Sequence, residues 1–252
     1  MPIYKIIHKT LYTYKEMLER EEDGVISSDA VQKARDWLAE GATDFEWWEC
    51  TIDTWKEALE QIGFTKPEIQ FSGFYNQGDG ASFTSGMDVE ELLKFICSEI
   101  TPDRWINPAQ KSNKEDFRPW ILHNIGQSGP GSYIGRLGRP PLGEKEARRV
   151  KRLIPLAADE LSGQVHRLGG YGVHESTCHV SLDFSDTGYH RHVRLERLVN
   201  DLEDILEDLR RNISHAIFES LREEYEYRIS DVALTEDAEA NGYTFDRFGN
   251  RE

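Results

Sequence analysis

The stretch FSGFYNQGDGASF, residues 71–83, decides the fold because it places a short polar segment between two apolar runs. The runs extend outward as EIQFSGFY and ASFTSG, and the five residues NQGDG separate them. Two strand-like runs joined by a short loop with glycines are typical of a β-hairpin. A phosphate-binding loop runs instead from a strand into the N-terminus of a helix. We therefore predict a hairpin whose exposed tip offers Gln77 and Asp79 for recognition.

Helical patterns flank this hairpin in the sequence. Ser27 or Ser28 is a good N-cap for the helix DAVQKARDWLAEG, which Gly41 should end. Asp88 is predicted to cap the helix that follows the hairpin. Before the hairpin, large apolar side chains recur at three- and four-residue steps up to Gly63 and indicate a helix; we predict that they fill a core and do not form a site. These side chains are Trp47, Trp48, Ile52, Trp55 and Leu59.

The strongest periodic signal is an apolar seam near the C-terminus. Its steps of three and four residues predict one long helix that packs on the sheet and has an acidic outer face. After it, Ser230 should cap a short helix that ends at Gly242, and YTFD is interpreted as a last small strand. The seam consists of Leu195, Leu198, Leu202, Ile205, Leu209, Ile213, Ala216 and Leu221.

Alternating polar and apolar residues predict the remaining strands. Residues 3–14 alternate in this way, and so do residues 173–184 within a histidine-rich region of two or three strands. Together the patterns predict an α+β fold, in which a mainly antiparallel twisted sheet has helices on one face and a long C-terminal helix. We expect a single domain over residues 1–252, with a Gly/Pro-rich and basic insertion at about 101–160.

The chain is strongly acidic, with 30 Lys and Arg against 46 Asp and Glu and a formal charge of -16. Such a surface repels bare nucleic acid and anionic membranes, so we expect neither as a direct partner; it suits a basic protein surface. No apolar run is long enough to span a bilayer, and the N-terminus lacks a signal-peptide core, which favours a cytosolic protein. The widely spaced Cys50, Cys97 and Cys178 are predicted to be buried reduced thiols.

The chain resembles a family of small proteins encoded by bacteriophages and prophages in three segments, SSDAVQKARDWLAEGATDFEWWE, IQFSGFYNQGDGASFTSG and EYEYRISDVALTEDAEANGYTFD. The family shows a helix around KARDW, a WW helix, a hairpin with FSGF and QGDGA, and an acidic C-terminal helix that ends in EANGY. The resemblance covers most of residues 1–100 and 187–248. Some members are labelled antitoxin of a toxin–antitoxin stability system. The resemblance implies a phage accessory protein in the host cytosol and implies no catalytic residues.

Five of the eight histidines fall within a short span. We expect His190 and His192 on one strand, where both rings point to one face, with His174 joining them from a neighbouring strand. These three are the candidate metal ligands, but no zinc or iron motif with fixed spacing is present, and polar edge-strand histidines are the simpler interpretation. A nucleophile–base pair between Ser176 or Ser181 and a distant histidine stays open.

Three functional hypotheses follow, and none requires a cofactor. The first, which we favour, is a non-enzymatic phage accessory protein that binds and neutralises or modulates a host protein, in an antitoxin-like or counter-defence role. A basic, nucleic-acid-handling host protein would suit the acidic surface. The contact surfaces would be the hairpin tip and the outer face of the long helix, with Glu203, Asp204, Glu207 and Asp208.

The two alternatives use other residues. A small-ligand or nucleotide-binding protein would form an anion site from Gln77 and Asp79 with Arg148 or Arg149 of the basic helix. A metal-dependent enzyme would be centred on the three candidate histidines.

Overall fold

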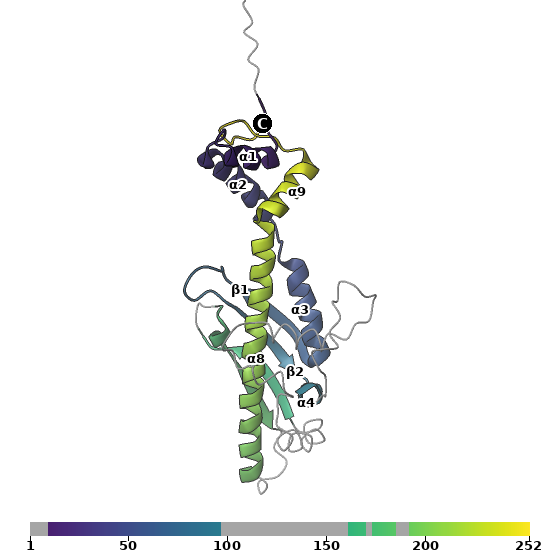
Figure 1. The fold of residues 1–252 in the computed structure, drawn as a ribbon. Helices are drawn as coiled ribbons and strands as arrows, with labels where there is room; N and C mark the ends of the chain where they lie inside the picture. Colours follow the sequence, from purple (N-terminus) through teal and green to yellow (C-terminus); the bar gives the residue numbers. More distant parts are fainter. Residues whose placement is uncertain (1–9, 97–160, 170–172, 185–191) are drawn as a thin grey trace, which may run out of the picture. The chain divides into compact units, whose positions relative to one another are not determined.

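The computed structural model describes residues 10–96, 161–169, 173–184 and 192–252. Within these residues, six α-helices and a four-stranded antiparallel sheet form an α+β fold (Figure 1). The predicted fold class, with its long C-terminal helix, is therefore confirmed.

Contacts within the chain define two compact parts. We call them unit 1 (Met1–Glu49 and Arg222–Glu252) and unit 2 (Cys50–Leu221). The single domain expected from the sequence stays a prediction.

The sheet belongs to unit 2 and has the order β1-β2-β3-β4, with each neighbouring pair antiparallel. The first two strands are the arms of the predicted hairpin, which is therefore confirmed. A bulge interrupts the first strand between Thr65 and Glu68, where Lys66 has a φ of 51°. The strands are β1 (Phe64–Phe71), β2 (Ala81–Met87), β3 (Leu161–Arg167) and β4 (Cys178–Phe184).

The two faces of this sheet differ in polarity. Directly paired residues share a face, and successive residues of a strand alternate between faces. Phe83, Val165 and Cys178 lie on one face and are buried. The opposite face carries polar residues on every strand, which is typical of an antiparallel sheet covered by helices on one side. The polar residues include Glu68, Gln70, Thr84, Gln164, His166, His179 and Ser181.

Three helices contribute to unit 2: α3 (Glu49–Ile62), α4 (Val89–Ile96) and α8 (His192–Arg228). Of the side chains predicted as core on this helix, Ile52, Trp55 and Leu59 are buried in α3, which confirms that part of the prediction. Trp47 is buried but, like Trp48, precedes the helix, and Trp48 is only half-buried. None of the helices in the described part of the chain combines the length and apolarity needed to cross a lipid bilayer. The buried seam of α8 comprises Leu202, Leu206, Leu209, Ile213, Ala216, Ile217 and Leu221.

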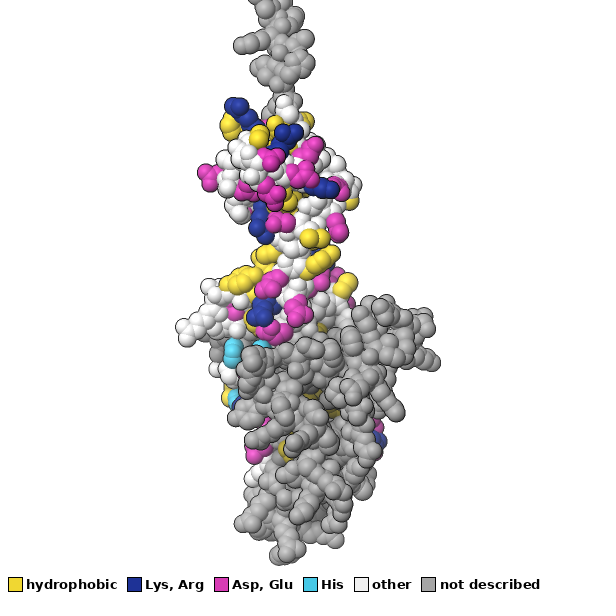
Figure 2. All heavy atoms as spheres, in the orientation of Figure 1, with side chains coloured by type: hydrophobic (Ala, Val, Ile, Leu, Met, Phe, Trp, Pro, Cys, Tyr) yellow, Lys and Arg dark blue, Asp and Glu magenta, His cyan; other side chains and the backbone are white. Residues whose placement is uncertain are grey.

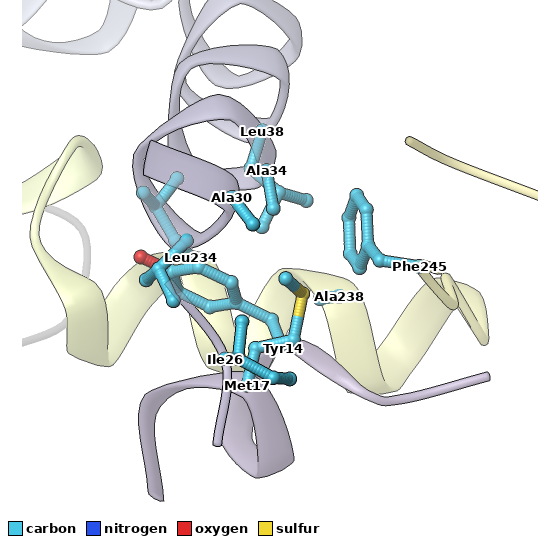
Figure 3. Packing of buried hydrophobic residues seen from close by; sticks show 10 residues of the cluster. Tyr14, Met17, Ile26, Ala30, Ala34, Leu38, Leu234, Ala238 and Phe245 are labelled. Carbon is cyan, nitrogen blue, oxygen red and sulfur yellow. The ribbon is translucent and has the colours of Figure 1, made fainter. Parts of the chain in front are cut away.

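Unit 1 packs α1 (Tyr14–Glu22), α2 (Ser28–Thr43) and α9 (Asp231–Asn241) around a small apolar core (Figure 3). Tyr14 and Leu234 are fully buried in it. The Tyr14 hydroxyl donates to Asp231 Oδ1 at 2.7 Å and so links α1 to α9. Burial and this hydrogen bond raise the pKa of Tyr14 above its usual value.

Local capping explains several helix boundaries. Ser27 caps α2 and Ser230 caps α9, both as predicted, and Gly242 ends α9 in the left-handed conformation. Asp88 accepts from Glu91 N at 3.1 Å and caps α4, also as predicted. The expected stop at Gly41 is wrong, because α2 continues to Thr43.

Some strand predictions are also wrong. The first part of the predicted strand 3–14, up to residue 9, lies outside the described residues. In the remaining part, Tyr12 forms an isolated bridge with Phe245, and Tyr14 begins α1. Thr13 forms a capping box with Glu16, and this reciprocal hydrogen bonding starts a helix where the alternation indicated a strand.

The histidine-rich region differs too. Residues Glu175–Thr177 form a short 3-10 helix, η4, and the strand begins only at Cys178. The thiol of Cys178 is buried as expected, but that of Cys50 is exposed, and Cys97 lies outside the described residues.

Candidate functional site

At the hairpin tip, the side chain of Gln77 is exposed, whereas that of Asp79 is half-buried and forms a hydrogen bond within the loop. Asp79 Oδ2 accepts a hydrogen bond from Asn76 N at 2.7 Å, and Asp79 N donates to Asn76 O at 3.1 Å. Gly78 lies inside this turn with a φ of 98°, which glycine adopts without steric cost. Asp79 is therefore a turn-forming residue, and Gln77 remains the candidate recognition group of the tip.

The loop at the tip connects strand to strand and is not a phosphate cradle. Ser72 N donates to Gly80 O at 3.0 Å, and Gly80 N donates to Ser72 Oγ at 3.2 Å, so the two strand ends are joined directly. No helix N-terminus follows β1, as an anion loop would require. Arg148 and Arg149 lie outside the described residues, so their part in an anion site stays a prediction.

The acidic side chains of α8 have two different environments. Glu207 Oε2 accepts from Val180 N at 3.0 Å, and Glu203 Oε1 accepts from Leu182 N at 2.8 Å. Both donors lie on β4, at an edge of the sheet, and point away from β3. Four residues of helix rise about 6 Å and two residues of strand about 6.7 Å, so carboxylates one turn apart match alternate strand N–H groups. Glu203 and Glu207 thus take the place of a neighbouring strand.

Arg210, which is buried, holds the carboxylate of Glu207 in this position. Its side chain is 0% exposed, and its guanidinium donates to Glu207 Oε1 at 2.8 Å and to the carbonyl oxygen of Glu175 at 2.7 Å. Burial alone would raise the pKa of Glu207, but the hydrogen bonds and charge of Arg210, the Val180 N–H and the charge of Arg211 outweigh it and hold this pKa below its usual value. Glu207 is therefore a structural anion at neutral pH.

Asp204 and Asp208 complete the set of four carboxylates expected to contact a partner, and both are exposed. The structure thus divides the predicted contact surface of α8 into one pair of side chains that hold the fold and one pair that face outward. A helical stripe of acids looks the same in sequence in both cases, because hydrogen bonds to a strand edge leave no spacing pattern of their own.

The histidines proposed as metal ligands do not lie on one strand. His174 Nδ1 accepts from Ser176 N at 3.2 Å and caps η4, while His192 is the first residue of α8. The expectation of a strand at His192 is therefore wrong, and His190 lies outside the described residues. Among the described residues, no group of three or more His, Cys, Asp or Glu side chains could hold a metal ion.

Sequence reasoning missed a cross-strand histidine pair on the polar face of the sheet. His166 of β3 lies directly opposite His179 of β4, and Ser181 Oγ lies 3.3 Å from His166 Nδ1. Histidine side chains gather on one flank of unit 2 (Figure 2). The alternation on both strands could have placed His166 and His179 on the polar face, but it does not show that they lie opposite each other.

Unit 1 carries most of the negative charge. It has 10 Lys and Arg against 20 Asp and Glu, a formal charge of -10, whereas unit 2 carries -6. Seventeen of those 20 carboxylates are exposed. Acidic side chains are scattered over the face of the unit that Figure 2 shows. The acidity found in the composition is thus concentrated on the smaller, helical unit.

The same unit also exposes apolar side chains. Of the eight large hydrophobic side chains exposed in the described residues, six belong to unit 1. An acidic surface with scattered apolar side chains offers both electrostatic attraction and area for burial to a partner. The six are Leu11, Val25, Phe45, Tyr227, Val232 and Phe248.

A family model matches one part of the chain. Residues 47–125 match the model of a family described as a domain of unknown function, DUF8835. The matched span includes α3, the β1–β2 hairpin and α4, and continues beyond the described residues. No curated protein matches the chain, and no solved structure does.

Proposed function

We propose that this chain is a non-enzymatic binding protein whose unit 1 engages a basic surface of another protein. The observation that carries the proposal is the exposure of 17 carboxylates on a unit of formal charge -10. The negative electrostatic potential of such a surface raises the rate of encounter with a positively charged partner. The same potential disfavours the binding of nucleic acid, which is negatively charged. Exposed apolar side chains on the same unit then supply contact area once the partner has arrived.

The cellular setting of the proposal comes from the resemblance to phage and prophage proteins. In that setting the partner is a host protein with a basic surface, such as one that handles nucleic acid, and binding neutralises or modulates it in the host cytosol. An antitoxin-like or counter-defence role is the form of this function that the resemblance supports.

Two charge-reversal variants of equal charge test which surface binds. The first, Glu236→Lys with Glu239→Lys, changes exposed residues of α9 in unit 1. The matched control, Asp204→Lys with Asp208→Lys, changes exposed residues of α8 in unit 2. Each double variant changes the net charge by the same amount and leaves Glu203 and Glu207 on the sheet edge.

Affinity capture from bacterial lysate at low and high salt gives the measurement. We expect the unchanged chain to retain a basic protein at low salt, the α9 variant to lose it and the α8 control to keep it. Equal retention by both variants, or retention that salt does not weaken, would show that the acidic surface of unit 1 does not bind the partner.

A further inference from the structure

The cross-strand histidines have a geometry that their sequence positions do not reveal. His166 and His179 are direct partners in the antiparallel register of β3 and β4, so both side chains leave the same face of the sheet. Directly opposed residues place their Cβ atoms about 5 Å apart. Both side chains are half-buried. Two imidazoles are thus held side by side on a rigid pair of strands.

Each ring has an oxygen beside its Nδ1 atom. Ser181 Oγ lies 3.3 Å from His166 Nδ1, and Glu207 Oε1 lies 3.7 Å from His179 Nδ1. A neutral imidazole whose Nδ1–H faces an oxygen keeps the lone pair of Nε2 free, which is the usual arrangement of a metal-binding histidine and its supporting oxygen. Glu207 is itself fixed by Arg210 and by Val180 N.

We propose that His166 and His179 form a two-histidine site for a borderline transition metal such as Zn²⁺ on the polar face of the sheet. Imidazole nitrogen is a preferred ligand of Zn²⁺, Cu²⁺ and Ni²⁺. Two protein ligands leave coordination positions open to water or to a donor from a bound molecule, so the site exchanges its metal and differs from a closed structural site. It is independent of the binding surface on unit 1.

The site also differs from the one formed by His174, His190 and His192. His174 uses Nδ1 in the cap of η4, and His192 begins α8. His215 offers a matched comparison, because its Nδ1 lies 4.0 Å from Glu219 Oε1 and because it belongs to α8 and not to the sheet.

Calorimetric titration of chelator-treated full-length protein with Zn²⁺ alone tests the proposal. We expect the His166→Gln, His179→Gln double variant to bind Zn²⁺ at least tenfold more weakly than the unchanged chain, with one equivalent lost. His215→Gln should bind like the unchanged chain. Binding that the double variant retains in full, or that disappears only in a His174→Gln, His190→Gln, His192→Gln variant, would overturn the assignment.

Ring-nitrogen NMR of the unchanged protein makes the test independent of variant folding. On adding Zn²⁺, we expect the Nε2 signals of two histidines to shift together while their Nδ1 atoms keep a proton. Shifts at a single histidine, or at Nδ1, would contradict a cross-strand site held through Nε2.

Discussion

Arg210 is the residue on which the contact between α8 and the sheet edge depends most. It is fully buried, and it neutralises a carboxylate that is itself only 15% exposed. A buried ion pair adds little over an apolar pair of equal size, but removing one partner leaves an uncompensated charge in a poorly solvated place. The same carboxylate has a second, exposed partner in Arg211, which permits a controlled comparison.

Replacing Arg210 by Met should lower the free energy of unfolding by about 3 kcal/mol, because Glu207 loses its buried counter-charge and the Glu175 carbonyl loses a donor. Replacing Arg211 by Met should cost less than about 1 kcal/mol, because exposed ion pairs contribute little. Urea unfolding of the two variants measures both values. Equal losses would mean that burial of the arginine does not set its contribution.

The lowered pKa of Glu207 predicts a loss of stability in acid. The folded state holds this carboxyl ionised below the value of about 4.5 that the unfolded chain has, so the unfolded state binds more protons in that range. The contribution is present above the unfolded value and disappears as the pH falls through the folded value. A Glu207→Gln variant should therefore be less stable than the unchanged chain at pH 7. Urea unfolding at a series of pH values should show this difference shrinking below pH 4.5; a constant difference would contradict the linkage.

The sequence predicted Glu203 and Glu207 as residues of an acidic face and could not show that they contact a strand. Helical periodicity reveals which residues share a face but not which other segment that face approaches. The β4 N–H groups that they accept from belong to residues more than twenty positions away. The same limit hid the histidine pair, since register between β3 and β4 depends on pairing that local pattern does not specify.

At the scale of elements, predictions succeeded where the signal was local. The hairpin followed from its glycine loop, and the caps at Ser27, Asp88 and Ser230 followed from side chains next to the helices they begin. The start of α1 was missed because the alternation of residues 3–14 runs up to its first residue, Tyr14, and only the Thr13–Glu16 pair marks the start. Competing local patterns of this kind are resolved by packing, which here buries Tyr14 and Met17.

Gly63 joins α3 to β1 in a conformation that only glycine adopts readily. Its φ is 109°, and an added Cβ would lie 2.9 Å from both Asp88 O and Leu92 N, which are backbone atoms at the start of α4. Gly63→Ala should therefore destabilise the protein by about 2 kcal/mol or more.

Gly41 provides the control, because a Cβ added there meets nothing within 4 Å and the residue lies inside α2. Gly41→Ala should stabilise the protein by about 0.5 kcal/mol through helix propensity. Thermal unfolding of the two variants should shift the melting temperature in opposite directions. If both variants shifted the melting temperature in the same direction, the backbone at Gly63 would accommodate a Cβ atom with little loss of stability.

At the scale of the whole molecule, α8 contributes several residues to each of the two units. Most of α8 belongs to unit 2, and its last residues, from Arg222 to Arg228, belong to unit 1. Each unit also has buried apolar residues of its own, Leu234 in unit 1 and Leu92 in unit 2 among them. A continuous helix favours cooperative unfolding, because breaking it in one unit removes hydrogen bonds that support the other.

The single domain predicted from the sequence can be tested through these two leucines. Leu234→Ala and Leu92→Ala each remove a fully buried side chain, and each should cost about 2–5 kcal/mol. If α8 couples the units, both variants lower one common unfolding transition, followed by calorimetry and by circular dichroism. Two transitions, with each variant lowering a different one, would instead show two domains that share a helix without sharing stability. In that case the acidic unit would unfold and bind as a separate module, and the charge-reversal changes on α9 would leave the stability of the sheet unchanged.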